Sequence, residues 1–220
     1  MSNNIAANAD QPARRQQQRS LVTQQKLLDA AISAFSENGF KGTSTRDIAE
    51  RAGVHHPLIT YHFKNKDQLW RAAADQVFTE FARVLAKALS ESGDACPKTR
   101  FTSMIRAFVR QTHKQPAIHR FIMQESSYQN TRLDWLIEAH MQPFFDATVG
   151  HIRTLQEIGV APAGNPAMLY HMIRISAGGM LAVSQLLVGT SKIDLDSEDT
   201  REELVQMIVR VFLPGDIPSQ

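Results

Sequence analysis

The sequence is poor in cysteine and in long apolar runs, and both deficits narrow the class of protein. Its 220 residues include one cysteine, Cys96, which excludes an intramolecular disulfide and any metal site built from several thiolates. The first 20 residues contain no apolar segment, so no secretory signal is expected. The longest uncharged run, residues 175–191, is short for a membrane span and contains glycine, serine and glutamine. We therefore expect a cytoplasmic protein with no membrane segment.

The patterns of β-structure and of catalysis are also missing. No alternating segment rich in Val, Ile and Thr is long enough for a strand, and the chain has no internal repeat. It contains no carboxylate pair, nucleophile elbow, glycine-rich phosphate loop or His–Glu metal pattern. The eight histidines are not spaced so that three share one helix face, so we predict no metal site and no cofactor. An all-α protein that is not an enzyme is the expectation.

Positive charge is concentrated in the first third of the chain. Residues 11–71 contain 10 Lys and Arg against 5 Asp and Glu, whereas residues 72–220 contain 14 against 16. Because net charge bears on partners rather than on fold, a basic first third favours nucleic acid as its partner. The remainder is nearly neutral and is expected to have another task.

Apolar residues at helical spacing run through most of the chain. Stripes, caps and breakers predict helices over residues 21–38, 66–90, 98–114, 116–127, 133–158, 166–188 and 198–212. Pro143 is expected to interrupt or kink the helix 133–158. The polar, Gln-rich residues 1–19 are predicted to be a disordered basic arm. Its arginines, Arg14, Arg15 and Arg19, either contact DNA or are simply solvated.

Between the first two of these helices, residues 44–63 predict two short helices joined by a tight turn. Ser44 with Asp47 three positions later is similar to a capping box, and Gly53 suits the left-handed end of the first helix. Pro57 is tolerated in the first turn of the second helix. The inward-facing positions are Ile48, Ile59 and Phe63. A helix too short to be stable alone that carries polar and aromatic groups outward fits a DNA major groove, so we interpret the pair as a helix-turn-helix.

Three segments of this region resemble the TetR (tetracycline-repressor) family of bacterial regulators. They are KLLDAAISAFSENGF at 26–40, TSTRDIAERAGV at 43–54 and YHFKNKDQL at 61–69. The resemblance covers about residues 21–81 with its spacing intact. It departs from the family at His55, read here as the cap of the second motif helix, where the family usually has Ser or Thr. The resemblance implies a homodimeric repressor that a small-molecule effector releases from a palindromic DNA operator.

The outward positions of the motif are the candidate DNA contacts. Arg46 lies just inside the first motif helix, where a guanidinium can reach a guanine edge or a phosphate, and by resemblance Thr45 and Arg46 face the DNA. Tyr61 and His62 resemble the family's phosphate-contacting pair of an aromatic residue and a histidine. Lys66 would add a further phosphate contact. The residues predicted to read bases are His56, Pro57 and Thr60.

The resemblance also assigns tasks to the two parts of the chain. It implies a three-helix DNA-binding head at 20–80, joined by a long fourth helix to a ligand-binding and dimerisation body at 81–220 of about five helices. By position in the family, 166–188 and 198–212 would pair with their copies in a homodimer.

The middle helices are rich in Met and aromatic residues, which are typical of core but can also line an adaptable cavity for an apolar or aromatic effector. The Gly178-Gly179 pair leaves room there for a ligand or for a close helix crossing. The candidate ligand contacts are Phe108, His113, Phe121, Trp135, His140, Phe144, His171 and Met172.

A rival interpretation stays open. The chain could be an all-α enzyme or small-molecule carrier whose first helices only resemble a DNA-binding head. Binding to a palindrome upstream of its own or a neighbouring gene would discriminate the two.

Overall fold

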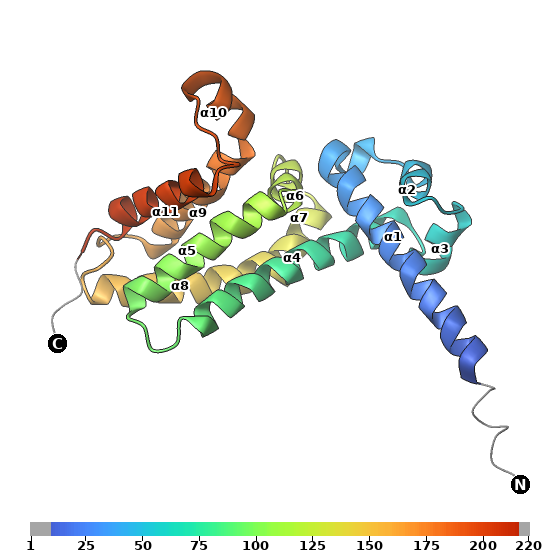
Figure 1. The fold of residues 1–220 in the computed structure, drawn as a ribbon, viewed down its shortest axis with the longest axis horizontal. Helices are drawn as coiled ribbons and strands as arrows, with labels where there is room; N and C mark the ends of the chain where they lie inside the picture. The colour runs from blue at the N-terminus through green and yellow to red at the C-terminus, as the bar shows by residue number, and fades with distance from the viewer. Residues whose placement is uncertain (1–9, 216–220) are drawn as a thin grey trace, which may run out of the picture. The chain divides into compact units, whose positions relative to one another are not determined.

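A computed structural model describes residues 10–215, and every regular element within them is helical (Figure 1). This confirms the all-α prediction. The chain divides into two compact units, one ending at Ala74 and the other beginning at Asp75. The elements are α1 (Asp10–Gly42), α2 (Thr45–Ala52), α3 (Pro57–Phe63), α4 (Lys66–Glu91), α5 (Pro97–Lys114), α6 (Ala117–Glu125), α7 (Thr131–Leu136), the π-helical η1 (Ile137–Met141), α8 (Gln142–Glu157), α9 (Pro166–Ala182), α10 (Ser184–Ser191) and α11 (Glu198–Phe212).

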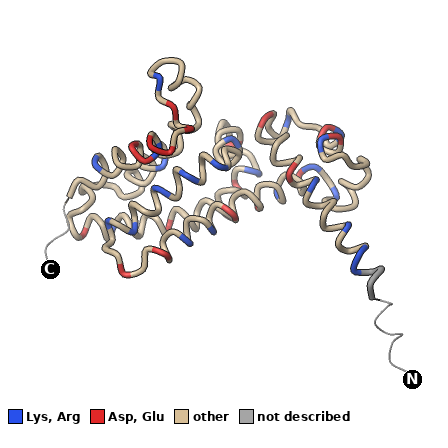
Figure 2. The backbone as a smooth tube through the Cα atoms, viewed as in Figure 1, with Lys and Arg blue, Asp and Glu red and all other residues tan. Residues whose placement is uncertain are grey.

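The start of α1 corrects one prediction. Residues 10–19 are helical, not disordered, while residues 1–9 lie outside the described part of the chain. Arg and Gln are good helix formers and no glycine separates them from the apolar stripe, so the helix extends back through this basic segment (Figure 2). At the other end, Gly39 has φ 70° and ψ 175°, so the regular helix stops at Asn38 as its sequence predicts.

The first unit encloses a small core between α1, α2, α3 and the start of α4. Its buried side chains include Leu27, Ala31, Phe35, Ile48, Ile59, Phe63, Leu69, Trp70 and Ala73. Phe40 closes this core by stacking on Phe35 with ring centroids 6.1 Å apart and by meeting Trp70 edge-on at 6.5 Å. The inward positions predicted for the motif helices therefore hold the two short helices against α1 and α4.

The core of the second unit lies between α5, α8, α9 and α11. Its buried side chains include Phe101, Ile105, Val109, Val149, Ile152, Leu155, Leu169, Ile173, Ala177, Val205 and Ile208. At its surface Glu202 of α11 accepts two 2.7 Å hydrogen bonds from the guanidinium of Arg106 on α5. These bonds hold the pKa of Glu202 at about 2.

Two of the predicted long helices are interrupted. The π-helical turn η1 ends just before Pro143, which confirms an interruption there, because proline removes a backbone donor and crowds the preceding turn. The predicted helix 166–188 is wrong only in its last six residues, since α9 ends at Ala182 and α10 begins at Ser184 after a bend of 74°. Val183 and Ser184 have low helix propensity, so interrupting the helix at these residues costs little free energy.

No single helix among the described residues is long and apolar enough to cross a membrane. The bent pair of α9 and α10 passes that test by length and composition alone.

Candidate functional sites in the helix pair and in the body

The helix pair of the first unit is built by its caps. The Ser44 hydroxyl accepts a hydrogen bond from the Asp47 amide at 3.0 Å, which satisfies one free N–H of the first turn of α2. Gly53 has φ 65° and ψ 36°, the left-handed conformation that ends α2 and turns the chain toward α3. Arg51 then ties α2 to α1 through a 2.7 Å ion pair with Glu37. The capping prediction for α2 is confirmed.

The start of α3 differs from its prediction in one respect. The capping position is His56 rather than His55, and its side chain does not cap the helix. The imidazole Nε2 of His56 instead lies 2.9 Å from the hydroxyl of Thr45 on α2. Two residues predicted to contact DNA separately are therefore hydrogen-bonded to each other, and they join the N-terminal ends of the two motif helices.

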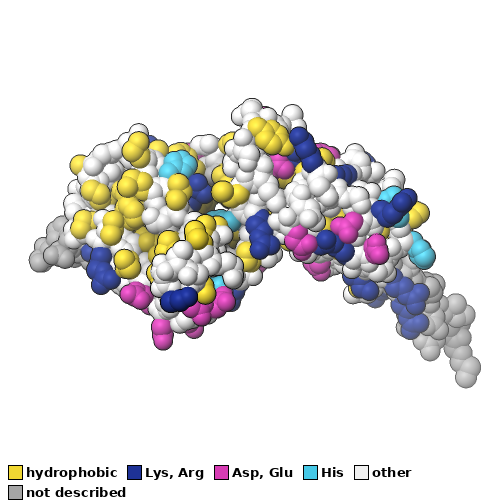
Figure 3. All heavy atoms as spheres, turned by 90° about the horizontal axis from the view of Figure 1, so that it is seen from above, with side chains coloured by type: hydrophobic (Ala, Val, Ile, Leu, Met, Phe, Trp, Pro, Cys, Tyr) yellow, Lys and Arg dark blue, Asp and Glu magenta, His cyan; other side chains and the backbone are white. Residues whose placement is uncertain are grey.

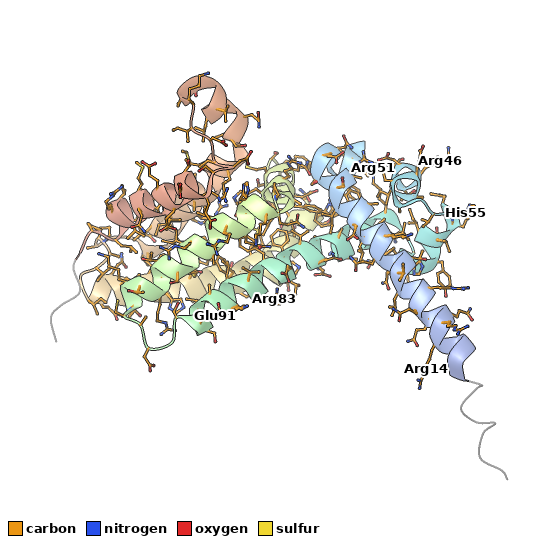
Figure 4. The ribbon with its side chains drawn as sticks, viewed as in Figure 1. Arg14, Arg46, Arg51, His55, Arg83 and Glu91 are labelled. Atoms are coloured by element: carbon orange, nitrogen blue, oxygen red, sulfur yellow. The ribbon has the colours of Figure 1, made fainter. Side chains whose placement is uncertain are left out.

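The remaining predicted contacts differ in exposure. Arg46, Pro57 and Thr60 are exposed, and Tyr61 is 75% exposed. Arg46 and His55 extend away from the core of the first unit in Figure 4. This exposure next to buried Ile59 gives α3 one inward and one outward face.

Two predicted phosphate contacts pack against aromatic rings. His62 is half-buried, with its ring edge-on to Tyr61 at 4.9 Å, and the ammonium of Lys66 lies 4.4 Å above the Phe40 ring. Lys64, which our sequence reasoning missed, is exposed just after α3 with φ 64°. The basic residues of the extended α1, Arg14, Arg15 and Arg19, are also exposed. Contact of this segment with DNA stays a prediction.

The second unit contains two adjoining, mostly apolar cavities. The first is lined by residues of α5, α8 and α9, and the second also by α4, α6 and η1. Their volumes are about 30 and 50 Å³. The side chains common to both linings are Phe108, Phe144, Tyr170 and Arg174. Because the same four side chains line both spaces, the two cavities are neighbours.

The predicted ligand contacts divide between these cavities and other places. Phe108 and Phe144 line both, and His140 lines the second. Trp135 lines neither cavity but meets the ring of His140 edge-on, with ring centroids 5.2 Å apart. The other four do not line either cavity: Phe121 is buried in the core, His113 faces Asp196 at 3.7 Å, Met172 is half exposed, and His171 stacks on Phe145.

Sequence reasoning missed two polar groups of the cavities. His119 on α6 is 9% exposed and its Nε2 has no hydrogen-bond partner. Burial, with a smaller contribution from the charge of Arg174, lowers its pKa to about 4. Arg174 on α9 has a buried Nε that is also unpaired. A lone His or Arg in a helix gives no local signal, and these two residues meet only through tertiary packing.

The imidazole of His119 lies directly over Gly178. A Cβ atom built at Gly178 would come within 1.7 Å of His119 Nε2, whereas one at Gly179 would meet only Ile175 Cγ2 at 3.5 Å. Of the two explanations offered for the glycine pair, the close helix crossing applies to Gly178.

Gly178→Ala should therefore destabilise the protein, and Gly179→Ala is the matched control. We expect the first to cost about 1–3 kcal/mol, because His119 must move within a packed site. The second should be neutral or stabilise by about 0.4–1 kcal/mol, because alanine restricts the unfolded chain more than glycine. Urea denaturation of both variants measures the difference. Equal stabilities would mean that the His119 contact does not constrain α9.

No group of three or more His, Cys, Asp or Glu side chains within residues 10–215 is placed to hold a metal ion.

The first unit has the features of a helix-turn-helix. Helix α2 is capped by Ser44, the inner face of α2 and α3 is buried, and Arg46 and Tyr61 are exposed on the outer face. The protein is therefore a helix-turn-helix protein with a second, helical unit.

Comparison with known proteins specifies the family. The sequence model described as "Bacterial regulatory proteins, tetR family" matches residues 27–73. The HTH-type transcriptional repressor Rv3405c of Mycobacterium tuberculosis is 46% identical over 59 residues, which are 27% of this chain and 31% of that protein. The probable HTH-type transcriptional regulator YttP of Bacillus subtilis is 24% identical over 119 residues, 54% of this chain and 58% of YttP. The matched segments thus span less than two thirds of these curated relatives.

Solved structures share the fold over nearly the whole chain. The TetR family regulator PfmR from Thermus thermophilus superposes with a TM-score of 0.63 at 17% identity, covering 86% of this chain and 97% of PfmR. AibR, solved in complex with isovaleryl coenzyme A and operator DNA, superposes with a TM-score of 0.71 at 17% identity, covering 88% of this chain and 100% of AibR. The segment at residues 27–73 thus belongs to the TetR family of bacterial regulatory proteins.

Proposed function

We propose that the protein is a homodimeric transcriptional repressor that a small-molecule effector releases from a palindromic DNA operator. The observation that carries this proposal is the α2–α3 pair, which packs its inner face on a small core and presents Arg46, Thr60 and Tyr61 to solvent. Such short helices with polar outer faces enter the major groove in helix-turn-helix proteins. The name of Rv3405c, a repressor, and the operator complex of AibR support the same interpretation.

Selection of binding sites from random double-stranded DNA tests the proposal directly. We expect enrichment of a palindrome whose half-sites are about one helical turn, roughly 34–36 Å, apart or a multiple of it. Affinity for the selected site should fall steeply with salt, because basic side chains displace counterions from phosphates. Failure to enrich any sequence would favour the alternative interpretation. In that case the protein would be an all-α enzyme or carrier whose first unit only resembles a DNA-binding domain.

The homodimer is supported by an apolar surface on the second unit. Met168, Met172 and Ile175 form a stripe along α9, and Met207 and Val211 form another along α11. Each is at least half exposed. Hydrophobic side chains gather on this side of the second unit in Figure 3. Large contiguous apolar patches are uncommon on monomers, and two packed helices with outward stripes suit pairing with a second copy as a four-helix bundle.

The double replacement Met172→Glu and Val211→Glu should give a monomer. Charges buried without partners in a twofold interface oppose association, and each appears twice in the dimer. Sedimentation velocity measures the mass, with Ala86→Glu at an exposed position of α4 as the control. A dimer that persists in the double variant would show that the copies pair through another surface.

A route from the body to the head is available through α4. This helix contributes buried Leu69 and Trp70 to the first unit and buried Phe81 and Leu85 to the second. Within the second unit, His140 lines the larger cavity, and its Nε2 lies 2.8 Å from Asp75 Oδ1 on α4. A ligand that displaces His140 would therefore act on α4. By linkage, bound operator must weaken effector binding by the same factor that effector weakens operator binding, typically about 5–150-fold.

A further inference from the structure

The body contains a cation with no counter-ion. Arg174 lines both cavities, yet none of its nitrogens forms a hydrogen bond or ion pair within residues 10–215, and its Nε is buried. No Asp or Glu lines either cavity. Arg174 as a whole is half-buried, so it is the buried Nε that lacks both water and a partner. Burying a polar group without a partner costs free energy, so proteins usually pair such a group or use it to bind an anion.

The groups around Arg174 can donate hydrogen bonds but bring no negative charge. Tyr170 is 6% exposed, and burial raises the pKa of its hydroxyl, which therefore stays protonated at neutral pH. His119 lines the same cavity, and its Nε2 has no partner. Thr148, in the smaller cavity, already donates to the Phe144 carbonyl at 2.8 Å. Arg174 and Tyr170 thus supply both cavities with hydrogen-bond donors, whereas the Nε2 of His119 is packed against Gly178.

Apart from His140, whose Nε2 lies 2.8 Å from Asp75 Oδ1, the rest of the lining is apolar or aromatic. Phe81 and Phe108 meet edge-on with centroids 5.2 Å apart, and Phe144 lies edge-on to Tyr170 at 6.3 Å. Ile118 and Ile122 of α6 contribute to the larger cavity. A bound molecule would therefore meet one charged end and an apolar remainder.

We propose that these two adjoining cavities together bind the monoanion of a small apolar organic acid, with its carboxylate on Arg174 and its hydrocarbon part between Phe81, Phe108 and Phe144. This inference rests on the proposed function in one respect, that the acid is the effector. A guanidinium pairs with a carboxylate through two parallel hydrogen bonds. A neutral apolar compound would leave Arg174 unpaired, and a phosphate dianion would bring one charge more than the lining can neutralise.

Matched acid and amide probes test the charge requirement. Phenylacetate and phenylacetamide, and hexanoate and hexanamide, are titrated into the full-length protein by calorimetry, with tryptophan fluorescence as a second readout because Trp135 lies beside His140. We expect each acid to bind at least about tenfold more tightly than its amide, since hydrogen bonds to charged groups contribute about 1.5–3 kcal/mol. Arg174→Met should abolish this preference, whereas Arg174→Lys should retain part of it.

Three controls separate the possible failures. Thermal melts establish that the Arg174 variants fold, and Arg153→Met on an exposed position of α8 should keep the full preference. Equal affinity for acid and amide, a preference that persists in Arg174→Met, or no binding of any probe at millimolar concentration would each overturn the inference. Titration with the selected DNA is independent of these outcomes. Acid binding without DNA binding would contradict the repressor, and DNA binding without acid binding would contradict only the ligand class.

Discussion

Arg46→Ala and Tyr61→Ala should each weaken binding to the selected operator by roughly tenfold to a hundredfold. Loss of one bidentate contact between Arg46 and a base costs about 1–3 kcal/mol. Loss of Tyr61 removes a contact that positions α3 on the phosphates. Both side chains are exposed, whereas the inner face of the same helices is filled by Ile48, Ile59 and Phe63. The free protein should therefore keep its stability. Fluorescence anisotropy with labelled duplex measures the affinity, and thermal melts measure stability.

Arg83→Ala is the matched control for charge. Arg83 is also an exposed arginine, but it lies in the second unit, where it pairs with Glu80 of the same helix at 2.7 Å (Figure 4). Its replacement should leave operator affinity nearly unchanged. If Arg46→Ala and Tyr61→Ala bind the duplex as tightly as the unaltered protein, α2 and α3 do not form the DNA-binding surface.

The free energy of unfolding should fall by up to about 3 kcal/mol between pH 7 and pH 4 because of His119. In the folded protein, burial first and the Arg174 charge second hold the pKa of His119 near 4, against 6.5 for the unconstrained group. Between these values the unfolded chain binds the proton and the folded protein does not, so stability is lost as pH falls through this window. Glu202, whose pKa is about 2, contributes a further loss only below about pH 4.5.

Urea titrations at a series of pH values measure this slope. His119→Asn should flatten it between pH 4 and 6.5, even though the smaller side chain lowers stability at neutral pH. His151→Gln, at an exposed position of α8, should leave the slope as it is. A slope that persists in His119→Asn would assign the acid sensitivity to other groups.

Local sequence determined the first unit closely. Caps and inward positions lie within a few residues of each other, so Ser44, Gly53, Ile59 and Phe63 predict α2 and α3 without knowledge of the rest of the chain. The same helical spacing predicts that Arg46 and Tyr61 are exposed, as the structure shows. The start of α1 was misjudged because polar composition was given more weight than the helix propensity of Arg and Gln.

Only the tertiary structure decided the chemistry of the body. His119 meets Gly178, and His140 meets Asp75, across 59 and 65 positions of the chain respectively. Helical periodicity places a residue on a face but does not say which other face it meets, so neither pair was visible in the sequence. Arg174 likewise reads as an ordinary basic residue within an apolar helix until packing buries its Nε and places it in two cavities with no carboxylate in their linings. A buried charged group without a partner favours binding of an oppositely charged ligand, and only the assembled fold determines which charged groups are buried.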